Sequence, residues 1–194
     1  MTDRVTNSVG GERAVGGAAF ETLHAVALAV WLAVVVGAGL AVAVVFPTMK
    51  ELDPMVPGFA ASPGDHWLIA GGHVGRTVFA IADRVQPVCV VVAVVALAGL
   101  TRMRCVGRAW LAARWALVGG AGVMAVVSGV WLSPRMDQNL VSFWDAARAG
   151  RAAEAAVFRS AFDSDHPKAS TLLSATAGCV LLAIGVAAAS RGRR

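Results

Sequence analysis

The chain has 194 residues, of which 57% are hydrophobic and only 15% charged, and its mean hydropathy is +0.67. Soluble domains carry roughly 25% charged and about 45–50% apolar residues, so the composition excludes an ordinary soluble protein. A net charge of +5 would suit a nucleic-acid ligand, but in so apolar a chain the basic residues are explained as the cytoplasmic flanks of membrane spans. We therefore expect this protein to reside in a lipid bilayer and to bind no nucleic acid.

Apolar residues concentrate in four uncharged stretches, at 22–49, 85–101, 115–134 and 169–190. A helix of about 20 apolar residues crosses the ~30 Å hydrocarbon core of a bilayer. The stretches are apolar on all sides rather than alternating, which predicts helices and not the strands of a β-barrel. The predicted fold is all-α, an integral membrane four-helix bundle with antiparallel spans at about 22–46, 74–101, 113–133 and 168–190.

Basic residues near the ends of the spans predict the orientation. Nine of them lie in the N-terminal tail (1–19), the connection between the second and third spans, and the C-terminal tail (191–194). Both termini are therefore expected in the cytoplasm, with 1–19 as a disordered tail and 20–190 as a single transmembrane domain. Fifteen arginines against two lysines, with abundant Ala, Val and Gly, are typical of a bacterial genome rich in GC, and hence of an inner-membrane protein.

The two outer connections differ in character. Residues 47–65 are rich in proline and glycine, which predicts an irregular loop. Residues 136–162 place apolar side chains at helical spacing among charges, which predicts one or two amphipathic helices at the outer surface, interrupted at Gly150. A helical hairpin that extends the bundle is the alternative. Ser164, followed by Pro167, predicts the start of the fourth membrane helix.

Small residues recur at every fourth position in three spans, where they allow close approach of helices in lipid. The rows are Ala25, Ala29, Ala33, Gly37 and Ala41; Ala121, Ala125, Gly129 and Ser133; and Ala175, Cys179, Ala183 and Ala187. We expect these rows to face the interior of a tight bundle.

Polar residues inside membrane helices are costly, which makes them candidates for function. On the second helix His73, Arg76 and Asp83 fall on one stripe, and on the fourth His166 and Ser170 share a face. At 1.5 Å per residue both stripes lie near the outer interface. We therefore predict an outward-facing ligand-binding site built from these five side chains. The alternative is an arginine–aspartate network that only anchors the helix ends.

No catalytic residue and no metal site is predicted, because the sequence contains no complete catalytic motif. His73 and His166 are the one same-side helical pair able to hold haem, although they belong to the rim of the bundle. Copper bound by Cys89 and Cys179 is a further alternative, but buried cysteines are more often plain small hydrophobic residues. His24 belongs to the opposite, cytoplasmic end, where we expect it to hydrogen-bond a neighbouring helix.

Several short patterns occur in a characteristic order. They are Phe20-x3-His24 with Trp31 in the first span, Phe46-Pro47 at its end, Gly72-His73-Val74-Gly75-Arg76 with Phe79 and Asp83 in the second helix, and Phe162-x3-His166-x3-Ser170 before the fourth span. Over roughly residues 20–190 this order resembles the small four-helix membrane family typified by transmembrane protein 205, a domain of unknown function. The resemblance implies four helices and an outward polar cluster, and it implies no reaction. Where such proteins often show an Asn late in the last span, this chain has Ser174 or Thr176.

Three hypotheses on function follow from the sequence. The first is a non-enzymatic membrane protein that transports or senses a small solute through the outer polar cluster. The second is a membrane redox protein that binds haem or a metal. The third is a structural partner that packs against another membrane protein or against a second copy of itself.

Overall fold

The computed structural model describes residues 2–59, 66–104 and 106–191, with side chains from Val15 onward. Throughout these residues the regular structure is helical. The helices are α1 (Thr2–Leu52), α2 (His66–Met103), α3 (Arg108–Val126), α4 (Ser133–Arg148) and α5 (Ala152–Arg191), with a π-helical segment, Val127–Leu132, joining α3 to α4. α1 thus begins within the segment that the sequence predicts as a disordered tail.

Four continuous helices are long and apolar enough to cross a membrane. They are Val15–Leu52, His66–Met103, Arg108–Arg148 and Ala152–Arg191, and each contains one of the predicted spans. Large apolar side chains such as Val44, Val91 and Leu181 are more than half exposed on their outer faces. Such surfaces suit hydrocarbon rather than water. The prediction of an all-α, four-helix membrane fold is confirmed, and the chain is a multi-pass membrane protein.

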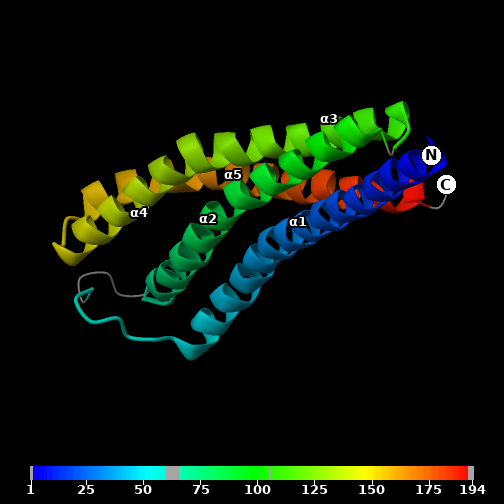
Figure 1. The fold of residues 1–194 in the computed structure, drawn as a ribbon. Coiled ribbons are helices and arrows are strands. Elements are labelled where there is room, and N and C mark those ends of the chain that lie inside the picture. The colour runs from blue at the N-terminus through cyan, green and yellow to red at the C-terminus, as the bar shows by residue number, and fades with distance from the viewer. Residues whose placement is uncertain (1, 60–65, 105, 192–194) are drawn as a thin grey trace.

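The four helices form two antiparallel hairpins, α1 with α2 and α3/α4 with α5 (Figure 1). Both termini lie at one end of the bundle, called here the termini end; the opposite end is the loop end. In the half near the termini the hairpins pack around one apolar core that includes Leu28, Trp31, Leu97, Val118 and Val180. Trp31 is fully buried.

The connection between the third and fourth spans is a helical hairpin. α4 follows α3 without a break, and α5 runs unbroken from Ala152 through Pro167 to Arg191. The turn between them holds Gly150, whose positive φ of 72° is readily adopted by glycine. The prediction of separate amphipathic helices at the outer surface is not supported, and the predicted helix start at Ser164 is wrong. The reason is that the apolar residues of α4 and α5, among them Phe143 and Ala155, pack against each other in a second core.

The row of small residues on α1 does not face the bundle as predicted. Ala29, Ala33 and Gly37 are exposed, whereas α1 buries Leu28 and Trp31 instead. Larger side chains make more contacts when buried, so they determine which face of α1 turns inward. On the other two rows, Ala121, Ala183 and Ala187 are buried, as expected.

Candidate functional site

A cleft of about 1040 Å³ separates the two hairpins in the half of the molecule near the loop end. We call it the interhairpin cleft. Its walls come from α1, α2, the π-helical segment, α4 and α5, so all four long helices contribute. Apolar side chains such as Phe46, Phe79, Leu140 and Phe162 alternate there with charged and hydroxyl groups.

Four of the five predicted site residues line this cleft: Arg76, Asp83, His166 and Ser170. The fifth, His73, does not. Its ring stacks on Trp144 with centroids 3.8 Å apart and planes 25° from parallel, and Trp144 itself lines the cleft. His73 therefore supports the wall of the cleft, and the structure does not bring it together with His166 at one exposed position.

Arg76 bridges the two hairpins. Its guanidinium forms an ion pair with Asp137 on α4, in which Nη2 donates to Oδ2 at 3.0 Å and Nε contacts Oδ1. Both side chains are nearly half exposed, so this pair contributes at most about 1 kcal/mol. The predicted arginine–aspartate contact thus exists, but its acid is Asp137 and not Asp83.

Asp83 and Arg84 carry opposite charges into the same cleft. The carboxyl group of Asp83 faces the hydroxyl of Ser133 on α4. Arg84 is exposed and forms no hydrogen bond or ion pair within the described part of the chain. The cleft therefore offers one acid and one base that do not neutralise each other through direct pairing.

Each of the four long helices contains one proline: Pro47, Pro87, Pro134 and Pro167. Because proline has no N–H, the carbonyl four residues earlier loses its usual helical donor. These carbonyls belong to Ala43, Asp83, Val130 and Asp163, and all of these residues except Val130 line the cleft. The prolines thus interrupt the helical hydrogen bonding of three residues that line the cleft.

The π-helical segment adds residues to the cleft that the sequence did not predict as part of the site. Ser128 and Gly129 within it, and Ser133 directly after it, line the cleft. Short π-helical segments are frequent at functional sites. The local signal was Pro134, which prevents a regular α-helical turn here.

Gln86 closes the cleft toward the core. It lines the cleft but is only 5% exposed, and its Oε1 accepts a hydrogen bond of 3.2 Å from Nε1 of fully buried Trp31. Below this pair, toward the termini, lies the apolar core. The cleft therefore ends at mid-bundle, where Gln86 and Trp31 meet.

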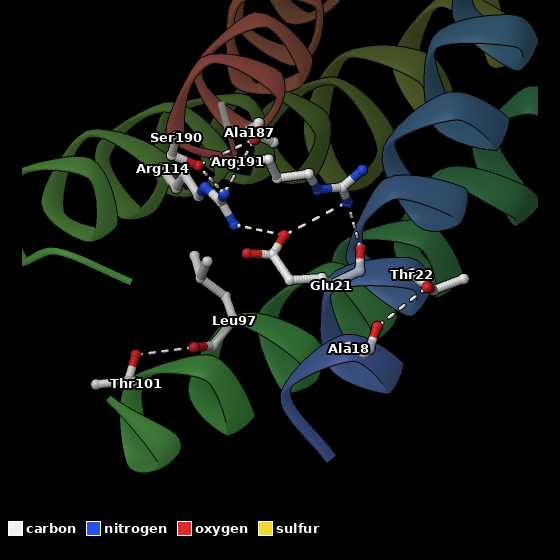
Figure 2. Close-up of polar contacts among 9 residues, drawn as sticks. All are labelled: Ala18, Glu21, Thr22, Leu97, Thr101, Arg114, Ala187, Ser190 and Arg191. Carbon is white, nitrogen blue, oxygen red and sulfur yellow. Dashed lines mark hydrogen bonds and ion pairs between the residues drawn. The ribbon is translucent and has the colours of Figure 1, made fainter. Parts of the chain in front are cut away.

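A second polar cluster lies at the termini end (Figure 2). Arg114 of α3 is fully buried; its Nη1 donates to Oε2 of Glu21 on α1 at 3.0 Å, and its Nη2 donates to the hydroxyl of Ser190 on α5. Half-exposed Arg191 reaches the same carboxylate at 3.4 Å. This cluster joins three helices. The sequence missed it because an arginine at the edge of a span is taken as a marker of orientation.

His24 lies beside this cluster and is fully buried. It faces the carbonyl of Ala93 on α2, yet neither ring nitrogen reaches hydrogen-bonding geometry with any described residue. The predicted hydrogen bond to a neighbouring helix is therefore not formed. Its position at the opposite end from His73 and His166 agrees with the predicted topology.

The described residues contain no group of three or more His, Cys, Asp or Glu side chains arranged to hold a metal ion. Cys89 is buried, Cys179 is half-buried, and both are free thiols. His66, at the start of α2, accepts a hydrogen bond at Nδ1 from the N–H of Val56, 2.9 Å away, and so fixes the loop that follows α1.

No protein-family model, curated protein or solved structure matches this chain. The function of this chain is therefore inferred from the fold, the interhairpin cleft and the cluster at the termini end.

Proposed function

We propose that this chain is a non-enzymatic membrane protein that binds a small polar solute in the interhairpin cleft, as a step in its transport or sensing. The observation that carries the proposal is the cleft itself, which gathers Arg76, Asp83, His166 and Ser170 from two helices. Ligand sites in membrane bundles are built from such inward-facing polar groups. Membership of the family typified by transmembrane protein 205 is part of the same proposal.

The lining favours a solute that carries both charges. Arg76 is engaged by Asp137, so Arg84 is the side chain that would bind an anionic group. Asp83 provides an acceptor for a cationic or donor group. A small zwitterion with an apolar portion, which would contact Phe79 and Phe162, matches this arrangement best.

We further propose that the loop end faces outward and that both termini lie in the cytoplasm of a bacterial inner membrane. Among the described side chains at the termini end, five arginines accompany one acid, Glu21. Such an excess is characteristic of cytoplasmic flanks.

The first test asks whether the cleft is filled with water. Ser170 lines the cleft, while Ser174, one turn further along α5, is exposed outside it. In a chain with its native cysteines replaced by alanine, we expect a water-soluble thiol reagent to modify Ser170→Cys much faster than Ser174→Cys. Equal protection of both positions would refute a solute site in this cleft.

The second test looks for the ligand directly. Amino acids, amines, carboxylates and phosphates are screened for a rise in the melting temperature of the purified protein. A compound that binds the cleft should lose its effect in Asp83→Asn or Arg84→Gln and keep it in Arg151→Gln, an exposed control at the loop end. Loss of the effect in the control as well would show that the compound acts elsewhere.

A structural role is the second candidate, because the small-residue face of α1 is exposed. Ala29 and Ala33 are exposed, and a Cβ built on Gly37 would meet no atom within 4 Å. Small residues of this kind allow a further helix to approach closely. Replacing Ala33 with Leu should then change the oligomeric state, which size-exclusion chromatography with light scattering measures. If the protein is a monomer both before and after the change, this structural role is contradicted.

The haem alternative is tested by an absorption spectrum of protein purified from haem-replete cells. A Soret band that shifts on reduction and is lost in His166→Ala would favour it. A colourless protein would leave the solute site as the proposal.

A further inference from the structure

A shallow groove lies between α2 and α3 at the termini end, on the outer surface of the bundle. It has a volume of about 520 Å³ and is lined by Ala98, Thr101, Arg102, Arg104 and Trp115. It is independent of the interhairpin cleft, which occupies the other half of the molecule.

The two arginines of this groove pair with no acid among the residues whose side chains are described. Arg102 and Arg104 are both exposed, and neither side chain forms an ion pair or hydrogen bond within the described ranges. The one described acid at this end, Glu21, is already bound by Arg114 and Arg191. The groove therefore presents two guanidinium groups whose charge is not compensated by the described protein.

The backbone holds one of these arginines in an unusual conformation. Arg104 has a positive φ of 53°, and its N–H donates to the carbonyl of Thr101 at 3.3 Å to end α2. Glycine usually occupies this position at the end of a helix. Here the residue is an arginine, and its side chain lies beside the groove.

Trp115 forms the wall opposite. Its Nε1 donates to the hydroxyl of Thr101 at 3.2 Å, and that hydroxyl in turn donates to the carbonyl of Leu97 at 2.8 Å. The indole ring is therefore fixed at the level of the two arginines. Tryptophan is the residue preferred at the boundary between headgroups and acyl chains.

An apolar track leads from the groove toward the middle of the membrane. Arg102, Ala98, Val95 and Val91 follow one another at intervals of four, three and four residues on α2, so they share one face. Val95 is 53% and Val91 60% exposed. The two arginines at the end of α2 are thus followed, toward the middle of the membrane, by an exposed apolar stripe. A phospholipid has its groups in the matching order, with a charged headgroup followed by apolar acyl chains.

From this geometry we infer that the groove binds the headgroup of an anionic phospholipid. Arg102 and Arg104 contact its phosphodiester, Trp115 packs against the glycerol region, and one acyl chain follows Val95 and Val91. Basic pockets between membrane helices bind anionic headgroups in this way. The proposal commits to a lipid, because a free phosphate would make no use of the apolar stripe.

The test uses native mass spectrometry of the full-length chain in detergent, with phosphatidylglycerol and phosphatidylcholine of identical acyl chains as probes. We expect phosphatidylglycerol to be retained preferentially. Arg104→Gln should weaken its binding about fivefold, in line with the attraction per basic residue near an anionic membrane surface. Trp115→Leu should also weaken it, although this change leaves the charge unaltered.

Arg108→Gln is the matched control, because Arg108 is an exposed arginine at the start of α3 that does not line the groove. If Arg108→Gln weakens binding as much as Arg104→Gln, and Trp115→Leu has no effect, the attraction is unspecific and the proposal is overturned. Displacement of the lipid by millimolar inorganic phosphate would also overturn it in favour of a phosphate site. If the melting temperatures of the variants are unchanged, misfolding is excluded as the cause of weaker lipid binding. None of these outcomes depends on the interhairpin cleft.

Discussion

Gly99 on α2 lies directly against the ring of Phe20 on α1. A Cβ built on Gly99 would come within 2.6–2.7 Å of three ring atoms of Phe20, including Cγ. The ring of Phe20 could avoid this contact only by adopting another rotamer. The side chain of Phe20 packs against the core of the bundle. The two helices therefore approach closely at this point because position 99 has no side chain.

We predict that Gly99→Ala lowers the free energy of unfolding by about 1–3 kcal/mol, the usual cost of forcing an extra methyl group into a packed interface. Gly178→Ala on α5 is the control, since a Cβ there would meet no atom within 4 Å. It should be neutral or stabilising by up to about 1 kcal/mol. Unfolding by SDS in mixed micelles measures both, and equal losses would contradict the close contact.

The buried Arg114 and the exposed Arg76 make ion pairs of very different consequence. Arg114→Met leaves the carboxylate of Glu21 buried and removes its fully buried ion-pair partner, so we predict that the free energy of unfolding falls by about 3–5 kcal/mol. Arg76→Met removes the half-exposed ion pair with Asp137 and should lower the free energy of unfolding by about 1 kcal/mol or less.

The double variant Arg114→Met/Glu21→Gln checks the cause of this loss. Because it removes the buried carboxylate charge together with its partner, it should be more stable than Arg114→Met alone. A double variant whose losses simply add would show that the two side chains are not coupled. The same unfolding measurement serves for all of these variants.

At the scale of the helix, α1 turns larger side chains such as Leu28 and Trp31 inward, whereas α2 buries mostly small residues. Ala93 on α2 is completely buried in the core, whereas Ala33 on α1 is exposed. We predict that Ala93→Leu lowers the free energy of unfolding by about 1–3 kcal/mol or more, because the core has no space for the added atoms. Ala33→Leu should leave the stability of the chain within about 0.5 kcal/mol. The reverse order of melting temperatures would mean that α1 is rotated in the bundle.

The prolines of the long helices interrupt the regular helical hydrogen bonding at residues that line the cleft. One proline in each long helix releases a carbonyl, and three of the four residues concerned line the same cleft although they belong to different helices. Such irregular backbone is tolerated at membrane depth where it is buried or lines a cavity. The coincidence at one cleft ties these helix irregularities to the proposed solute site.

At the scale of the whole molecule, the hairpins are joined firmly at one end and separated at the other. Arg114, Glu21 and Ser190 connect α1, α3 and α5 near the termini, while the cleft of about 1040 Å³ separates the hairpins toward the loops.

The orientation is tested by labelling single cysteines in a chain whose native cysteines are replaced by alanine. A membrane-impermeant thiol reagent should label Arg151→Cys on intact cells and Arg108→Cys only after permeabilisation, because the two positions lie at opposite ends of the bundle. The reverse result would invert the orientation. Labelling of both positions from one side would contradict the four-span fold.

Hydropathy and helical period are local properties, and they were sufficient to predict four spans, the antiparallel order and the two polar stripes. The resemblance to a known family added nothing that the structure tests. In contrast, the pairing of Arg76 with Asp137 and the burial of Arg114 join residues that are far apart in the sequence.

Only the tertiary structure decided which face of each helix turns inward and where the hairpins separate. In lipid both faces of an apolar helix are acceptable, so sequence alone leaves the rotation of a helix undetermined. For that reason the small-residue row of α1 was placed on the wrong side, and the part that Ser133 and the π-helical segment take in the cleft was not foreseen. The sequence determined that this protein spans a membrane four times; packing between distant segments decided where it can hold a ligand.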